Sequence, residues 1–218
     1  MGTGETGVAE RVDRQWFIVG RWQEYEGEAR ANVLRFAAIA AFYIVELTNY
    51  YGLKLGVLEV PPMATASFHQ AATAVAVAWM MLGLVILLCL KERIFPASLK
   101  YFSTGGDLVF LTCVITLGTG PKSPLVAAYF VVMALAALRF SLGLVRFATL
   151  GSMAGYLFLL GYAWWFPERK LHVPRYHQLL VVLALGFTGI VLGQVIRRVH
   201  GLAKDYAARL QAGRGESA

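Results

Sequence analysis

The sequence predicts an all-α polytopic membrane protein, a six-transmembrane-helix bundle with the N- and C-termini in the cytoplasm. The first of three observations behind this prediction is composition. Of the 218 residues, 58% are hydrophobic and only 15% are charged, and the mean hydropathy is +0.59. A soluble domain of this size does not expose so much apolar surface without associating. The other two observations are long apolar runs and an uneven distribution of Lys and Arg.

Six apolar runs are long enough, or nearly long enough, to cross a bilayer as helices. They occupy residues 33–53, 68–90, 101–119, 125–140, 143–165 and 177–196. The fourth run is the shortest, and we expect its helix to include turn residues before it. Runs that are apolar throughout, without alternation, favour helices over the strands of a barrel. We therefore expect six crossings of the membrane.

The distribution of Lys and Arg predicts the orientation of these spans. An even number of spans places both termini on one side, and only five of the 20 Lys and Arg residues fall on the other side. These five are Lys54, Lys122, Arg169, Lys170 and Arg175. Because basic segments stay in the cytoplasm, we expect cytoplasmic termini and a multi-pass protein of the cell's inner (plasma) membrane. The net charge of +7 then reflects this bias and an attraction to anionic lipid, so we expect the lipid bilayer as a partner and no nucleic acid.

The expected organisation has three parts. Residues 1–32 form a cytoplasmic or interfacial lead, where Trp16 and Trp22 stand among charges and suit a helix at the membrane surface or a partner site. Residues 33–196 form the six-helix transmembrane domain, and residues 197–218 form a cytoplasmic amphipathic helix and tail. We expect any output to reside on another chain, unless the sequence is a truncated input domain.

Two carboxylates fall inside the predicted spans, where ionisable groups are costly and point to function. Asp107 lies in the third span, at the depth of Arg35 and Arg139, and we expect a structural ion pair between Asp107 and one of these arginines. Glu46 lies in the outer half of the first span, about 10 Å from Asp107 in depth. We therefore expect two separate polar sites rather than an acid–base pair.

The segment GTGPKSPL, residues 118–125, joins the third and fourth spans on the outer side. Gly and Pro suit a short connection between helices, and Pro124 suits the first turn of the fourth span. The segment is therefore explained as a turn alone. The alternative is that it belongs to a ligand site at the membrane interface.

This turn resembles a loop in the redox-responsive sensor histidine kinases of the RegB/PrrB type, in which six spans precede the kinase. Their loop carries a Gly-Gly-x-x-Asn-Pro-Phe heptapeptide associated with quinone binding, and residues 119–125 read Thr-Gly-Pro-Lys-Ser-Pro-Leu. Gly120 and Pro124 match. Thr119, Ser123 and Leu125 depart from Gly, Asn and Phe, which removes an amide donor and an aromatic stacking surface.

The wider frame, residues 33–200, is similar to the six-span input domains of bacterial sensor kinases and related membrane cyclases. Asp107 lies early in the third span, and the Gly-x-x-Ser-Pro turn is followed by YFVVMALAALRFSLG with Tyr129 and Arg139. The resemblance implies a sensor domain for signal transduction, which passes a conformational change through its sixth helix to a cytoplasmic partner. It also implies a small lipophilic ligand, such as a quinone, at the outer interface.

A quinone-like head group needs hydrogen-bond donors for its carbonyls and an apolar slot for its ring. The candidate ligand-binding residues are Glu46, Asn49, Tyr50, Gly120, Ser123, Pro124, Tyr129 and His177. For these residues to meet, the first and fourth spans must pack together at the outer interface. No other cofactor is expected.

The sequence contains no catalytic triad, phosphate-binding loop or metal-ligand spacing, so we expect neither enzymatic activity nor a metal site. The alternative to a sensor is a non-catalytic structural or assembly subunit of a larger membrane complex. Gly151 and Gly155 have the spacing of a close helix contact, either within the bundle or in a homodimer. A small transporter would need inverted repeats, and none is evident.

Overall fold

The computed structural model describes the backbone of residues 3–55, 58–92, 96, 98–166 and 171–215. Within these it describes the side chains of residues 25–52, 61–92, 96, 98–166 and 171–203. This part of the chain forms six α-helices, one short β-hairpin and two 3-10 turns. The fold is therefore all-helical apart from the hairpin.

Each predicted apolar run lies mainly in one helix of its own. The helices are α1 (Thr3–Tyr51), α2 (Ala66–Lys91), α3 (Leu99–Leu117), α4 (Ala128–Ala137), α5 (Leu142–Trp165) and α6 (Arg175–Gly215). By length and composition, α2, α5, residues Tyr25–Tyr51 of α1 and residues Arg175–Ala203 of α6 could each cross a membrane. The fourth run begins in the turn η2 (Pro124–Ala127), which follows the turn η1 (Gly120–Lys122), and α4 starts only at Ala128.

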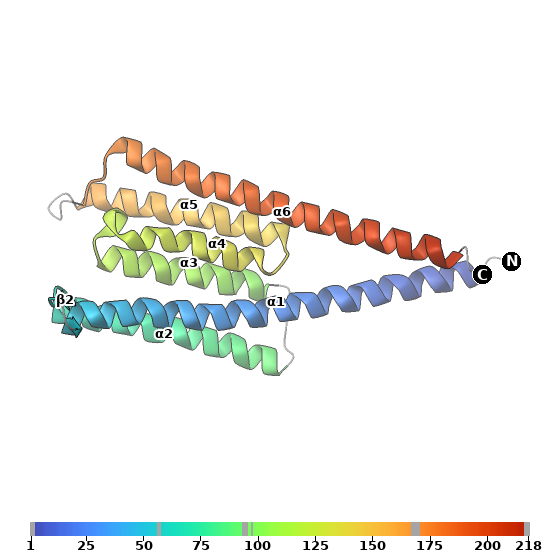
Figure 1. Cartoon of the computed structure of the whole chain (residues 1–218), viewed down its shortest axis with the longest axis horizontal. Coiled ribbons are helices and arrows are strands. Elements are labelled where there is room, and N and C mark those ends of the chain that lie inside the picture. Colours follow the sequence, from blue (N-terminus) through green and yellow to red (C-terminus); the bar gives the residue numbers. More distant parts are fainter. Residues whose placement is uncertain (1–2, 56–57, 93–95, 97, 167–170, 216–218) are drawn as a thin grey trace.

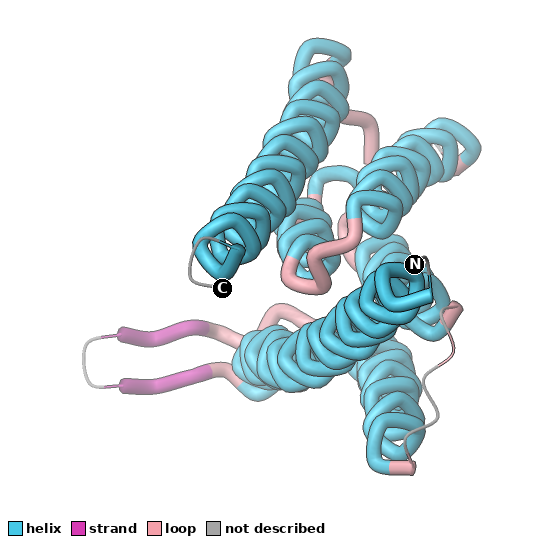
Figure 2. The backbone as a smooth tube through the Cα atoms, turned by 90° about the vertical axis from the view of Figure 1, so that its right-hand side faces the viewer, coloured by secondary structure: helices cyan, strands magenta, loops and turns pink. Residues whose placement is uncertain are grey.

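The helices pack side by side in a bundle (Figure 1). α1 packs against α2, α2 against α3, α3 against α5, and α5 against both α4 and α6. α1 and α6 continue beyond the other helices at the end of the bundle that carries both chain termini, which we call the termini end. The perpendicular view of Figure 2 shows that the ends of these two extensions lie apart across the bundle.

The long helices are continuous where the sequence suggests changes of environment. α1 runs without a break from the predicted lead, residues 1–32, into the first span. α6 likewise runs through the predicted boundary at residue 197 to Gly215. Both helices therefore join the apolar bundle directly to polar segments at the termini end through an unbroken helical backbone.

The opposite end of the bundle, which we call the hairpin end, carries the connection between α1 and α2. The strands β1 (Leu53–Leu55) and β2 (Leu58–Val60) pair antiparallel, with Lys54 opposite Glu59. Figure 2 shows this hairpin projecting sideways from the bundle. Two prolines after β2 end the extended segment. Thr65 is the N-cap of α2, and its Oγ accepts a hydrogen bond from the Phe68 amide at 3.3 Å.

Glycines allow the helices of this chain to pack closely on one another. A Cβ on Gly151 of α5 would lie 2.4 Å from Leu108 Cδ1 of α3, and a Cβ on Gly189 of α6 would lie 2.3 Å from Thr149 Oγ1 of α5. In a bilayer, where apolar burial gives little driving force, such close contacts stabilise helix association. Gly151 therefore takes part in packing within the bundle, one of the two roles that its spacing predicts.

Candidate functional site

Four charged side chains lie together in the half of the bundle nearer the termini end. Glu28 and Arg35 come from α1, Asp107 comes from α3, and Arg139 follows α4 directly. Each of these side chains is at most 3% exposed. We call these four residues, together with Ser103, the charge cluster.

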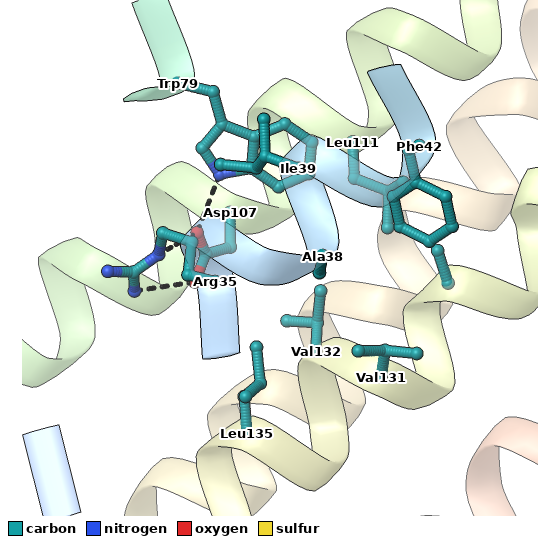
Figure 3. A pocket seen from close by; sticks show the side chains of 11 residues that line it. Arg35, Ala38, Ile39, Phe42, Trp79, Asp107, Leu111, Val131, Val132 and Leu135 are labelled. Atoms are coloured by element: carbon teal, nitrogen blue, oxygen red, sulfur yellow. Dashed lines mark hydrogen bonds and ion pairs between the residues drawn. The ribbon is translucent and has the colours of Figure 1, made fainter. Parts of the chain in front are cut away.

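The first ion pair of the charge cluster joins α1 to α3. Arg35 donates from Nε to Asp107 Oδ1 at 2.6 Å and from Nη2 to Oδ2 at 2.9 Å, a bidentate arrangement. The Trp79 indole of α2 donates to the same Oδ1 at 2.8 Å (Figure 3). Arg35 Nη1 donates to the side-chain oxygen of Asn32, whose amide nitrogen donates in turn to the Gly83 carbonyl at 3.1 Å. Three helices are thus held around one carboxylate.

The second ion pair joins α1 to the end of α4. Arg139 donates from Nη2 to Glu28 Oε1 at 2.9 Å, and its Nε lies 2.8 Å from Oε2. Its Nη1 donates to the Thr104 hydroxyl. Ser103 connects the two pairs, because its hydroxyl donates to Glu28 Oε1 at 3.0 Å and accepts from Arg139 Nη2 at 3.0 Å and from Arg35 Nη2.

The two positive and two negative charges of the cluster cancel. A single ionised group in the apolar region of a membrane is expensive, whereas paired and hydrogen-bonded groups are tolerated. Removing one partner of a buried pair leaves an uncompensated charge and costs about 3–5 kcal/mol. The cluster therefore specifies how α1, α3 and α4 meet.

Local sequence explains how the cluster forms. Glu28, Asn32 and Arg35 are spaced by four and three residues, so they share one face of α1. Gly27 lets this face approach the α4 end, because a Cβ there would lie 3.1 Å from Arg139 Cα. Phe140 follows in the left-handed region, with φ of 48°, and turns the chain from α4 toward α5.

Sequence analysis offers either Arg35 or Arg139 as the partner of Asp107. In the structure Arg35 contacts Asp107, and Arg139 contacts Glu28 instead. Glu28 is not among the residues predicted from the sequence, because it falls in the segment assigned to the lead. The spacing of seven and four residues could have identified it, because Glu28, Arg35 and Ile39 lie on one stripe of buried positions along α1.

A small cavity of about 20 Å³ adjoins the Arg35–Asp107 pair. Apolar side chains of α1 and α4, among them Ile39, Phe42 and Val132, line the rest of it (Figure 3). This volume is enough for about one water molecule and far too small for a quinone ring.

At the hairpin end, Glu46 and Tyr50 of α1 contact His69 of α2. His69 Nδ1 lies 3.0 Å from Glu46 Oε1 and 3.1 Å from Oε2. The Tyr50 ring stacks on the imidazole, with 4.0 Å between ring centroids and 6° between their planes. Asn49 takes part through its backbone, since its carbonyl accepts hydrogen bonds from the amides of residues 63 and 64.

The turn between α3 and α4 is held by its own contacts and by a residue of the connection between α5 and α6. Gly120 adopts a left-handed conformation with φ of 58°, which favours glycine, and packs on Leu171. The Ser123 amide donates to the Gly120 carbonyl at 2.9 Å, and its hydroxyl accepts from the Leu125 amide at 3.2 Å. Pro124 begins η2, in line with its expected place in the first turn of the fourth run.

Tyr129 and His177 lie in different surroundings. The Tyr129 side chain is buried, and its hydroxyl lies 2.7 Å from Thr112 Oγ1. Gly155 leaves room for this pair, because a Cβ there would lie 2.7 Å from the Tyr129 hydroxyl. His177 is exposed near the start of α6, and its ring lies 6.5 Å from that of Tyr176.

The structure thus brings together only part of the ligand site expected from the sequence. Glu46 and Tyr50 meet around His69. Among the residues whose side chains are described, no hydrogen bond, ion pair or ring contact links either of them to the turn, to Tyr129 or to His177. Within the same residues, no group of three His, Cys, Asp or Glu is placed to hold a metal ion.

Comparison of the chain with protein-family models, with curated proteins and with solved structures finds no match. The assignment of function therefore depends on the geometry described above and on the resemblance of the turn and its surroundings.

Proposed function

We propose that this chain is a membrane-embedded sensory input module of the bacterial inner membrane, without enzymatic activity of its own. In this proposal it crosses the membrane six times, with the termini end in the cytoplasm. A small lipophilic ligand such as a quinone changes the packing of the bundle. α6 then passes the change to a cytoplasmic or membrane protein partner.

The observation that carries the proposal is the continuity of α6 from Arg175 to Gly215. A helix without a hinge transmits a shift or rotation of its membrane part to its far end. α1 has the same property and is tied to α3 and α4 by the charge cluster. Two long helices that leave one bundle at one end suit an input module better than a passive subunit.

The contacts at the hairpin end support the place that the proposal gives to the ligand. Of the residues suggested by the resemblance, Glu46 and Tyr50 both contact His69, and the three side chains offer a carboxylate, a phenol and a stacked aromatic surface. The turn at Gly120 is the second subsite of the proposal, supported by its match to the kinase loop.

A chimera tests the function. A cyclase catalytic domain fused after residue 218 reports the state of α6 as cyclic nucleotide produced by isolated membranes. We expect a ubiquinone analogue with a short tail to change this activity, and Tyr50→Phe with His69→Ala to reduce the response. The structural or assembly subunit is favoured instead if the cyclase activity is the same with and without the analogue and is also unchanged by Glu28→Gln.

A further inference from the structure

Arg146 of α5 and Arg197 of α6 lie on the same side of this helix pair. The contact between Thr149 and Gly189 shows which faces of the two helices meet. Arg146 precedes Thr149 by three residues, which places it about 60° around the α5 axis from the contact. Arg197 follows Gly189 by eight residues, which places it about 80° around the α6 axis from the contact. Because α5 and α6 run antiparallel, rotations of the same sign lead to the same side of the pair.

Both arginines are exposed, and neither has a carboxylate partner among the residues whose side chains the structure describes. From the Thr149–Gly189 contact, Arg146 lies about 5 Å and Arg197 about 12 Å toward the termini end. The backbones of the two residues thus differ by only about 7 Å in depth, a distance that two long arginine side chains can span to reach a single phosphate group. Arginine binds phosphate through charge-assisted hydrogen bonds.

An apolar strip continues from the two arginines toward the hairpin end. Leu150 and Leu157 follow Arg146 by four and eleven residues, and Ile190 precedes Arg197 by seven, so all three lie on the same side of the pair as the arginines. Their side chains are 67%, 54% and 59% exposed. The surface is therefore cationic at one end and apolar along its length, which matches an amphipathic anion.

We propose that Arg146 and Arg197 bind the phosphate head group of an anionic phospholipid, whose acyl chains lie along the apolar strip between α5 and α6. The apolar strip favours a phospholipid over free phosphate, because the phosphate alone would leave it uncovered. The site goes beyond the sensory function proposed above and does not depend on it. It requires only that the termini end lies at a layer of lipid head groups.

Native mass spectrometry of the full chain in a neutral detergent, titrated with phosphatidylglycerol, tests the site. The double variant R146Q/R197Q should bind phosphatidylglycerol at least about tenfold more weakly than wild type. The matched control is R146Q/R198Q, which loses the same charge. Arg198 follows Gly189 by nine residues and so points away from α5, and this control should bind no more weakly than R146Q alone.

Two further titrations identify the ligand. Phosphatidylcholine should bind wild type more weakly than phosphatidylglycerol does, and inorganic phosphate at the same concentration should not displace phosphatidylglycerol. Circular dichroism in the same detergent confirms that the variants are folded. Equal losses in the two double variants would overturn the site in favour of diffuse charge. Displacement by inorganic phosphate, or equal binding of both lipids, would overturn the phospholipid assignment.

Discussion

Arg139 and Glu28 lie side by side in the bundle, with 2.9 Å between Nη2 and Oε1, although 111 residues separate them in the chain. The contact joins the segment just before the first apolar run to the end of the fourth run. It also connects to the Arg35–Asp107 pair through Ser103. A displacement of α1 therefore cannot occur without breaking or rearranging contacts to both α3 and α4.

Glu28→Gln should destabilise the bundle, because it leaves the Arg139 charge buried without a counter-charge. The expected loss is about 3 kcal/mol in the free energy of unfolding, measured by denaturant titration in bicelles. The matched control is Glu26→Gln, which removes an exposed pair with Arg30 on the same helix and should cost less than about 0.5 kcal/mol. Equal effects of the two variants would contradict the structural role of the charge cluster.

Gly189→Val should also destabilise the protein, because a Cβ at this position overlaps the Thr149 side chain. We expect a loss of about 1–3 kcal/mol, the usual range for overpacking. Gly186 lies one turn away on α6, and a Cβ there would meet nothing within 4 Å. Gly186→Val is therefore the control and should change stability little. If thermal unfolding in detergent ranks the two variants the other way round, the packing of α5 on α6 is wrong.

The topology is open to a direct labelling experiment. In a background with Cys89 and Cys113 replaced by Ala, Lys122→Cys should react with a membrane-impermeant maleimide added to intact cells. Leu202→Cys, which is exposed on the α6 extension, should react only after the cells are opened. Labelling of position 122 only in opened cells would place the turn in the cytoplasm and reverse the proposed orientation.

The sequence predicts the helices well and the sites less well, for physical reasons. Apolar runs reveal helices because a bilayer imposes both their length and their composition, so each predicted run lies mainly in one helix. The continuity of α1 was missed, because residues 1–32 are polar and polarity indicates a change of solvent rather than a break in the backbone. The hairpin was missed as well, because three-residue strands are too short to show a pattern.

Partners inside the bundle depend on how helices are rotated about their axes, which depth alone does not fix. Depth places Asp107 level with both Arg35 and Arg139, and only the packing of α1 decides that Arg35 takes this carboxylate. In the same way, depth groups Glu46, the Gly120 turn and His177 at one end. The rotation of each helix about its axis and the order in which the helices pack decide the actual contacts. Glu46 contacts His69, and the turn packs on Leu171.

The most direct test of the central claim is a distance measurement between the two long helices at the termini end. Spin labels at Arg30 of α1 and Leu202 of α6, both exposed, report their separation by double electron–electron resonance in nanodiscs. If the bundle is a two-state input module, Glu28→Gln should shift the distance distribution by about 2 Å or more, or change the ratio of two populations, whereas Glu26→Gln should not. A single distribution that is identical in wild type and both variants would contradict the account.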